Sequence, residues 1–306
     1  MNLLTRSDFD GLVCGALLKH LGVIDTWKFV HPKDMQDGLV AVTENDVLAN
    51  IPYAPGCGMW FDHHATEIER MGKNNLVPGE CRLAPSAARV IYEYYGGESV
   101  MPNFKGLVES CDKVDFGDLT ADEIQNPTSG VLLGFIMDPR TGLGRFRNFR
   151  ISNLALMEQL LDDCSTMTVD EILELPDVQE RVALYWEQNA LFKKMLEEYT
   201  KIEGNVIITD LRGVSPIYTG NRFLLYSLHP EQNVSVWIVD GRAGLNVAIA
   251  IGYSVLNRTC KSHIGRLCYS YGGGGHRQVG TCQVPTGDAN EVIEQIITTL
   301  QAEDQI

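Results

Sequence analysis

The segment CGMWFDHHAT at residues 57–66 places one carboxyl group and two imidazole groups directly after an apolar run. The apolar residues are typical of the end of a buried strand, and Asp62, His63 and His64 follow them. Ligands of open α/β sheets bind at the carboxyl ends of the strands, so these side chains predict a site that holds a metal ion or a proton. The alternative is an ordinary loop in which one histidine caps a backbone group and the other faces water.

A second acidic motif, SDFDG, follows the short strand predicted at the start of the chain. Asp8 and Asp10 lie two residues apart on this loop, and Gly11 permits a tight turn into the next helix. In a parallel sheet this loop and the loop with the Asp-His-His run lie at the same edge. Carboxylates favour Mn²⁺ or Mg²⁺ and imidazole favours softer metals, so the combination predicts a divalent transition-type ion.

A glycine run forms the third motif, in the stretch YSYGGGGHRQVGT. Glycines lose much conformational entropy on folding, so the run indicates a constrained backbone or a ligand at close range. Its backbone N–H groups could form an anion-binding nest, and the next two side chains could contact a phosphate. We therefore predict substrate binding by Gly273, Gly274, Gly275, His276 and Arg277, and the alternative is a flexible linker.

The motifs SDFDG, FDHH and GGGGH occur in this order and span nearly the whole chain. In this arrangement the sequence resembles the DHH phosphoesterase superfamily with a C-terminal DHHA1 domain. That group includes RecJ-type exonucleases, nanoRNases, cyclic-dinucleotide phosphodiesterases and exopolyphosphatase-like proteins. The resemblance implies a doubly wound DHH domain, a helical linker and a smaller α/β DHHA1 domain that closes over the substrate. It also implies two metal ions, usually manganese, which activate water for in-line attack on a phosphate.

The resemblance also implies roles for single residues. Asp62 would support the metal site from outside the coordination shell, and His64 would lie near the substrate. An aspartate from a later element completes the ligand set, and the segment ESCDKVDF offers Asp112, with Asp115 as the alternative. If neither is a ligand, this pair is a solvated helix end. The metal ligands implied by the resemblance are Asp8, Asp10, His63 and Asp112.

Two positions depart from the family pattern. Arg6 stands where the first motif commonly has a histidine. The aspartate that usually bridges both metals corresponds to Asn50 or, in another alignment, to Asp46. Asparagine cannot bridge two cations as a carboxylate does, and arginine cannot ligate a metal. We therefore expect one or two ions, Mn²⁺ or alternatively Mg²⁺. The catalytic residues would be Asp62, His64 and Arg6, and Arg6 would bind phosphate directly.

Alternating strands and helices would position the first two motifs. A helix at residues 85–95 begins with Pro-Ser and ends at Gly-Gly, which are the usual start and stop signals. This alternation predicts an α/β fold with a doubly wound parallel sheet. The other predicted elements are a helix at 11–22 and strands at 1–4, 26–30, 39–43 and 58–61.

The second half of the chain changes from helical to mixed. Residues 177–199 predict one long connecting helix, and DGRAG at 240–244 predicts a hairpin turn. The pattern divides the chain into a DHH domain at 1–175, a linker helix at 176–203 and a DHHA1 domain at 204–306. The predicted elements after residue 200 are strands at 205–209, 234–239 and 245–252, helices at 221–228 and 263–271, and a final strand followed by a helix from 288.

The composition limits the class of substrate. With 25 Lys and Arg against 40 Asp and Glu, the 306-residue chain has a formal charge of −15 and would repel long nucleic acids. A small phosphorylated substrate or a short oligonucleotide in one local positive site is compatible with this charge. Additional phosphate contacts, each equally interpretable as an ordinary surface charge, are Arg222, Lys261, His263 and Arg266.

The eight cysteines form no Cys-x-x-Cys pair, which favours reduced thiols in a cytoplasmic protein. We expect no signal peptide, no membrane contact and a chain that acts alone or as a homodimer.

The sequence is compatible with two functions. The first is a metal-dependent phosphoesterase that acts on a short oligonucleotide, a nucleotide or polyphosphate. The second is a phosphate- or nucleotide-binding protein on a DHH scaffold that has lost catalysis, which the departures at Arg6 and Asn50 favour.

Overall fold

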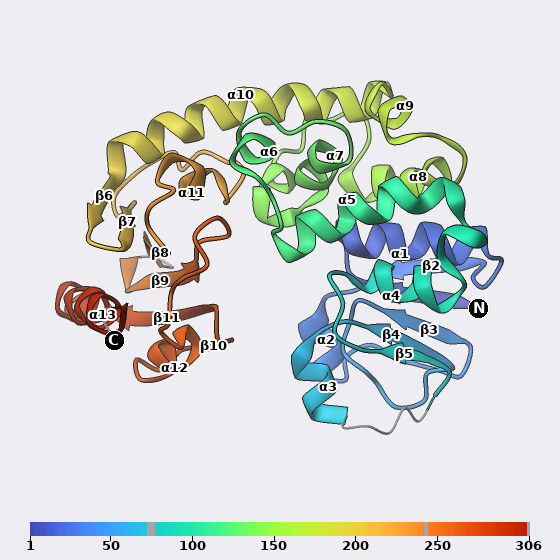
Figure 1. Ribbon diagram of the computed structural model, residues 1–306, viewed down its shortest axis with the longest axis horizontal. Coiled ribbons are helices and arrows are strands. Elements are labelled where there is room, and N and C mark those ends of the chain that lie inside the picture. Colours follow the sequence, from blue (N-terminus) through green and yellow to red (C-terminus); the bar gives the residue numbers. More distant parts are fainter. Residues whose placement is uncertain (72–76, 242–243, 305–306) are drawn as a thin grey trace. The chain divides into compact units, whose positions relative to one another are not determined.

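The computed structural model describes residues 1–71, 77–241 and 244–304 (Figure 1). The chain forms two compact units, one of residues 1–118 and 127–185 and the other of residues 119–126 and 186–306. Helix α10 (Pro176–Tyr199) occupies most of the segment predicted as a linker, and the division between the units falls within this helix. The three predicted functional domains remain a prediction. None of the described helices is long and apolar enough to cross a membrane.

The first unit is built on a five-stranded parallel sheet in the order β2-β1-β3-β4-β5, which confirms the predicted doubly wound topology. The chain passes from β1 to β2 on one side and then returns to place β3 on the other side of β1. Such a reversal opens a crevice at the carboxyl ends of the two strands. The strands are β1 (Asn2–Thr5), β2 (Thr26–Phe29), β3 (Asp46–Ala49), β4 (Met59–Asp62) and β5 (Gly79–Cys81).

Both faces of this sheet are covered. Helix α1 packs on β1 and against α4, and α4 also contacts β4 and β5. Met35 of α2 packs with Leu4, Leu48 and Trp60 of the sheet in a hydrophobic cluster whose described residues include none of α1 or α4. The helices of this unit are α1 (Phe9–His20), α2 (Pro32–Gln36), α3 (Ala65–Met71), α4 (Ala87–Tyr94), α5 (Lys105–Phe116), α7 (Ser129–Met137), α8 (Asn153–Thr166) and α9 (Val169–Leu173).

The strand predicted at residues 39–43 is wrong, because the strand lies at Asp46–Ala49. Leu39 is 73% exposed, whereas all four residues of β3 are buried. Asp46 can begin a buried strand because its carboxylate accepts hydrogen bonds from the backbone and hydroxyl of Thr43 and from the amide of Asn2. The buried strand therefore begins at a polar residue whose hydrogen bonds are satisfied, and the apolar run at 39–43 stays irregular.

The second unit contains a six-stranded sheet in the order β10-β11-β9-β8-β7-β6, antiparallel except between β7 and β8. Strands β8 and β9 pair as the predicted hairpin requires, but residues 242–243 of its turn lie outside the described residues. The elements are β6 (Thr200–Glu203), β7 (Val206–Asp210), β8 (Val234–Asp240), β9 (Asn246–Tyr253), β10 (Gly274–Gly275), β11 (Val279–Pro285), α6 (Ala121–Gln125), α11 (Leu224–Leu228), α12 (Ile264–Tyr269) and α13 (Ala289–Asp304).

Candidate metal centre

The first two motifs meet at the carboxyl ends of β1, β3 and β4. The register aligns Thr5 of β1 with Ala49 of β3, and Ala49 with Phe61 of β4. The residues that follow these strands therefore share one edge of the sheet. Gly11 is required there, since a Cβ atom on it would lie 2.0 Å from the carbonyl oxygen of Arg6. Close approach of the loop to the start of α1 thus fixes the position of the first motif.

Asp10 is held rigidly at the centre of this edge. Its Oδ1 accepts a hydrogen bond of 2.8 Å from the backbone N–H of Ala88, and its Oδ2 accepts one of 2.9 Å from Ala87. The thiols of Cys14 and Cys111 also donate to Oδ1, at 3.6 and 3.5 Å. Burial raises the pKa of Asp10 to about 6, although the nearby His63 lowers it. The carboxylate is thus oriented by the first turn of α4.

His63 presents a bare ring nitrogen to two carboxylates. Its Nδ1 lies 3.1 Å from the carbonyl oxygen of Ala84, which can only accept, so Nδ1 carries the proton in the neutral ring. Its Nε2 lies 3.6 Å from Asp10 Oδ2 and 3.4 Å from Asp115 Oδ2. The side chain is only 10% exposed, and Nε2 has no hydrogen-bond partner within the described part of the chain.

Three ligand atoms therefore converge, from Asp10, His63 and Asp115, and all lie within 4.8 Å of one another. A lone pair that faces two carboxylate oxygens is repelled unless a cation or a proton lies between them. One imidazole and two carboxylates suit a divalent ion such as Mn²⁺. The residues therefore fit the metal that the sequence resemblance implies.

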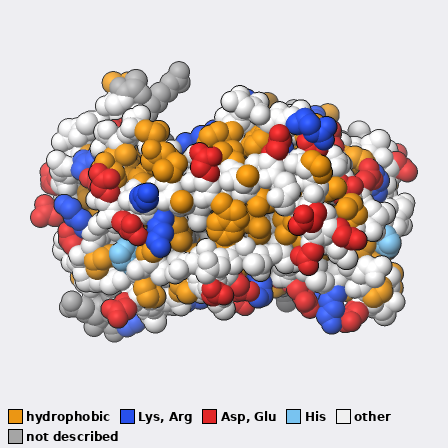
Figure 2. Space-filling model, turned by 90° about the horizontal axis from the view of Figure 1, so that it is seen from above, with side chains coloured by type: hydrophobic (Ala, Val, Ile, Leu, Met, Phe, Trp, Pro, Cys, Tyr) orange, Lys and Arg blue, Asp and Glu red, His pale blue; other side chains and the backbone are white. Residues whose placement is uncertain are grey.

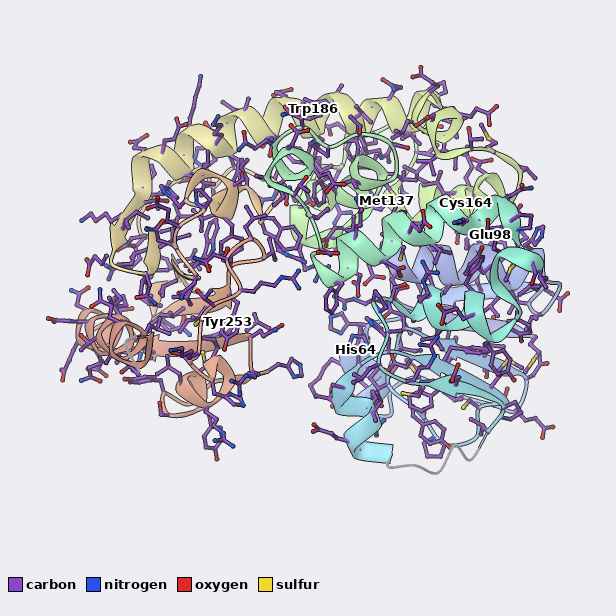
Figure 3. All side chains as sticks on the ribbon, in the orientation of Figure 1. His64, Glu98, Met137, Cys164, Trp186 and Tyr253 are labelled. Atoms are coloured by element: carbon purple, nitrogen blue, oxygen red, sulfur yellow. The ribbon has the colours of Figure 1, made fainter. Side chains whose placement is uncertain are left out.

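Asp62 and His64 form an ion pair next to this cluster. Asp62 Oδ1 accepts from His64 Nδ1 at 2.7 Å and from the backbone N–H of His63 at 2.8 Å. Burial lowers the pKa of His64, but the hydrogen bond to Asp62 and the charge of that carboxylate raise it to about 9. His64, which lies just before α3 and is marked in Figure 3, is therefore cationic at neutral pH. Asp62, His63 and His64 also have ligand atoms within 4.8 Å, but a metal there would break this pair.

Asp8 has a different environment from Asp10. Its Oδ1 accepts from the backbone N–H of Gly11 at 2.9 Å and from Nδ2 of Asn50 at 3.0 Å. Its Oδ2 lies 3.0 Å from Nε of Arg6. Burial raises the pKa of Asp8, and the charge of Arg6 opposes this effect. The structure thus brings both departures from the family pattern onto one carboxylate.

The structure also separates Asn50 from Asp46. Asn50 follows the carboxyl end of β3, is buried and has a φ of 56°, a left-handed conformation that asparagine tolerates. Asp46 begins the same strand, so it lies at the opposite edge of the sheet from the cluster. Of the two residues considered for the bridging position, the structure places Asn50 at the site.

Of the two aspartates predicted on α5, only Asp115 reaches the cluster. The predicted ligand Asp112 instead accepts a hydrogen bond of 2.6 Å from the hydroxyl of Ser86. Arg89 also donates to it twice, from Nε at 2.8 Å and from Nη2 at 2.6 Å. Asp112 thus fixes the start of α4, which in turn orients Asp10, and the alternative residue Asp115 takes the position beside His63.

Asp138 and Arg140 were not predicted from the sequence. They line a small cavity together with Asp8, Asp10 and Asp115. Arg140 Nε donates to both oxygens of Asp138, at 2.8 and 3.1 Å. Burial lowers the pKa of Arg140, but the charge of Asp138 and the hydrogen bond to it raise the pKa overall. The signal in the sequence was a charged Asp-Pro-Arg turn directly after the apolar helix α7.

Comparison with solved structures decides the family. The chain is 44% identical to a pGpG-specific phosphodiesterase, PggH from Vibrio cholerae, over 99% of both chains, with a TM-score of 0.88. The chain belongs to the DHH phosphoesterase superfamily. The predicted family and fold class are thereby confirmed. No family model and no curated protein matches this chain.

Two more distant structures resemble this DHH protein. A DHH-domain protein described as a member of the s1p family of ribosomal proteins is 13% identical, with a TM-score of 0.57, over 98% of this chain and 86% of that one. At this identity the likeness shows the fold alone. RecJ from Thermus thermophilus, solved in complex with Mn²⁺, is 14% identical, with a TM-score of 0.47, over 98% of this chain and 52% of that one.

The glycine run, the third DHH-type motif, lies in the second unit between α12 and β11. A Cβ atom on Gly273 would lie 2.0 Å from the carbonyl oxygen of Thr281, and one on Gly275 would lie 2.2 Å from that of Val279. These two glycines therefore let β10 pack closely against β11. Around Gly274, by contrast, a Cβ atom would meet nothing within 4 Å.

The predicted anion-binding nest is only partly available. The backbone N–H groups of Gly272, Gly273 and His276 donate to the carbonyl oxygens of Tyr269, Cys268 and Val279. The side chains of His276 and Arg277 are exposed. Contact of the glycine run with a substrate therefore remains a prediction, which rests on the side chains of His276 and Arg277 and on the open space beside Gly274.

Two of the four additional phosphate contacts, His263 and Arg222, have other partners. His263 caps α12 by accepting from the backbone N–H of Arg266 at 3.3 Å. The guanidinium of Arg222 lies over the ring of Phe223, 4.3 Å from its centroid. On the face shown in Figure 2, acidic and basic side chains are interspersed. A role of these residues in binding phosphate stays a prediction.

Proposed function

We propose that this chain is a metal-dependent phosphodiesterase that hydrolyses a short linear dinucleotide such as pGpG to two mononucleotides. Water adds to the phosphorus of the internal diester, and the ester bond to the 3′ oxygen of the first nucleoside breaks. The observation that supports it most is the convergence of Asp10, Asp115 and the unpartnered Nε2 of His63 at the sheet edge. The substrate is suggested by the 44% identity to a pGpG-specific phosphodiesterase over 99% of the chain.

Asp10, His63 and Asp115 would hold the metal. A divalent ion bound there supplies Lewis acidity to water and to a phosphate oxygen. The ligands are pre-oriented, since Asp10 is fixed by two backbone N–H groups and His63 by the carbonyl oxygen of Ala84. Manganese is proposed over magnesium because imidazole is a poor ligand for magnesium.

Positive side chains around the cluster would offset the charge of the substrate. His64 is cationic at neutral pH because of Asp62, so it can donate a hydrogen bond to the phosphate or a proton to the leaving oxygen. The side chains of Arg6 and Arg140 are 33% and 40% exposed, and each bonds an aspartate through Nε. Their terminal nitrogens have no hydrogen bond to any described residue and are directed to phosphate in this proposal.

A noncatalytic nucleotide-binding protein is the second candidate. It is favoured by one specific observation, the occupation of Asp8 by Arg6 and Asn50, which removes an expected metal ligand.

The cytoplasmic location and the homodimer remain predictions with no further support in the structure.

The test is hydrolysis of pGpG by protein stripped of metal with EDTA and reconstituted with Mn²⁺, followed by chromatography of the product GMP. We expect turnover that requires added metal and falls at least about 10³-fold in His63→Ala, which loses a ligand. Lys193→Ala, a change of an exposed residue of α10 in the second unit, should retain full activity. Tight binding of pGpG without turnover at any metal concentration would favour the noncatalytic candidate.

A further inference from the structure

Asp8 and Asp10 provide an internal comparison within one loop. Both carboxylates are buried, with exposed fractions of 4% and 2%. Asp10 Oδ2 accepts one hydrogen bond, from Ala87, and otherwise faces Nε2 of His63. Oδ2 of Asp10 therefore has a lone pair available for a cation. Asp8 could bind a metal ion in the same way only if one of its oxygens also had a lone pair free.

Both lone pairs of Asp8 Oδ1 are taken by protein donors, the backbone N–H of Gly11 and Nδ2 of Asn50. The other oxygen, Oδ2, carries the guanidinium of Arg6 at 3.0 Å. A metal ion bound to Oδ2 would lie beside a permanently charged group, and like charges repel. Among the described residues, Asp8 belongs to no group of side chains whose ligand atoms lie close enough together to hold a metal ion.

Asn50 makes this arrangement specific. Its side-chain amide is oriented with Nδ2 toward Asp8, which a carboxylate in the same place could not do without repulsion. Arg6 and Asn50 thus satisfy the same carboxylate from the ends of two strands, β1 and β3, which are neighbours in the sheet. The pair of departures is coherent, because Asn50 donates a hydrogen bond to Asp8 and Arg6 forms an ion pair with it.

We propose that the centre binds one divalent ion, through Asp10, His63 and Asp115, and that Arg6, anchored by Asp8 and Asn50, supplies the second positive charge. This proposal rests on the proposed metal-dependent function and disagrees with the two-ion site that the sequence resemblance implies. Asp8 is then a positioning residue for Arg6. The guanidinium contributes charge toward phosphate, but it cannot make water more acidic as a second ion would.

The experiment counts metal ions without measuring turnover. The EDTA-treated protein is titrated with MnCl₂ by calorimetry, and the dialysed product is analysed for manganese and by electron paramagnetic resonance. We expect one tight ion per chain and a spectrum of isolated Mn²⁺. Two tight ions, or the signature of an exchange-coupled manganese pair, would overturn the proposal.

A matched pair of variants tests the roles of the two aspartates. Asp10→Asn should weaken Mn²⁺ binding more than about 100-fold, whereas Asp8→Asn should weaken it about 10-fold, at the lower end of the loss for a residue outside the coordination shell. Equal losses in the two variants would contradict the assignment. If Asp8→Asn does not fold, as judged by circular dichroism, the ion count of the unmodified protein still decides.

A gain of function provides the converse test. The double variant Arg6→His with Asn50→Asp replaces both of these partners of Asp8 by metal ligands, and it should bind a second Mn²⁺ ion. Failure of the folded double variant to bind more manganese than the unmodified chain would count against the proposal. One ion with no hydrolysis of pGpG would refute the proposed function and leave this inference standing, so the two failures are distinguishable.

Discussion

Asp8 and Asp10 show how two residues of one type, two positions apart, acquire different chemistry. Asp8 caps α1 and pairs with Arg6, while Asp10 lies in the first turn of α1 and is held by α4. The difference comes from the partners that β3 and α4 bring to the loop. At this scale the chemistry of the site depends on which donors reach each oxygen rather than on residue type.

Arg140 should bind substrate without binding metal. Arg140→Gln should raise KM for pGpG about 10- to 100-fold, because a charge-assisted hydrogen bond contributes about 1.5–3 kcal/mol. Calorimetry should find Mn²⁺ binding nearly unchanged. The matched control is Arg147→Gln, which changes an exposed arginine in the same segment and should leave KM unaffected. An unchanged KM in Arg140→Gln would exclude this role.

Asp46 should be structural and should affect stability in a pH-dependent way. Although burial raises the pKa of Asp46, hydrogen bonds from Asn2 and Thr43 lower it below the ordinary 3.8 overall. Its contribution is therefore present above pH 3.8 and is lost as the pH falls through the lower pKa of the folded state. Asp46→Asn should cost about 2 kcal/mol of unfolding free energy at pH 7.

Urea denaturation at several pH values measures this effect, and the difference between Asp46→Asn and the unmodified protein should shrink below about pH 4. Asp34→Asn, a change of an exposed aspartate on α2, provides the control and should have little effect at any pH. Mn²⁺ binding should survive in Asp46→Asn. Loss of the ion instead would mean that Asp46 belongs to the metal centre.

At the scale of elements, the parallel sheet brings distant motifs together. β1, β3 and β4 are neighbours, so the residues after each strand share one edge, and α5 adds Asp115 from the side. Helix α4 has a double role, since its first turn holds Asp10 and Arg89 on it binds Asp112. The site is therefore as rigid as the packing of α4 on the sheet and of α5 against α1 and α4.

The glycine run allows packing to be separated from binding. Gly273→Ala should destabilise the second unit by at least about 1–3 kcal/mol, because its Cβ would overlap the backbone of β11. Gly274→Ala meets no neighbour and should leave the unfolding free energy nearly unchanged. If the run contacts substrate, Gly274→Ala should nevertheless raise KM about 10-fold, by obstructing close approach of the backbone.

Thermal unfolding and steady-state kinetics of both glycine variants provide the measurement. Gly287→Ala is the control, because a Cβ there also meets nothing within 4 Å and the residue lies outside the run. Normal KM in Gly274→Ala would show that the run serves packing alone.

At the scale of the whole molecule, the charge of −15 opposes long polyanions. We expect kcat/KM for pGpG to exceed that for a decanucleotide RNA by at least about 10-fold at low salt. The difference should narrow as NaCl is added, because salt screens repulsion between the protein and the longer chain. Equal rates for both substrates at low salt would contradict this expectation.

Much of the fold could be predicted from local pattern. Strands β1, β4, β7, β8 and β9 and the long helix α10 lie close to their predicted ranges, because hydrophobic periodicity and turn residues act over short distances. The strand at 39–43 was misplaced because a short apolar run does not reveal whether its backbone will pair with β1. The small elements β5, β6, β10, α2 and α3 were not predicted, since they are too short for a periodic signal.

The sequence by itself determined the family, the parallel sheet and the placement of Asp10, Asp62 and His63 at one edge of that sheet, because these depend on ordered motifs that directly follow strands. The tertiary structure decided between Asp112 and Asp115. Residues three apart share a face of a helix, so only the axial position of α5 determines which one reaches His63. It also brought Arg140 beside Asp8 and Asp115 from a distant segment. Such juxtapositions depend on packing between elements, and no local pattern in a single sequence records them.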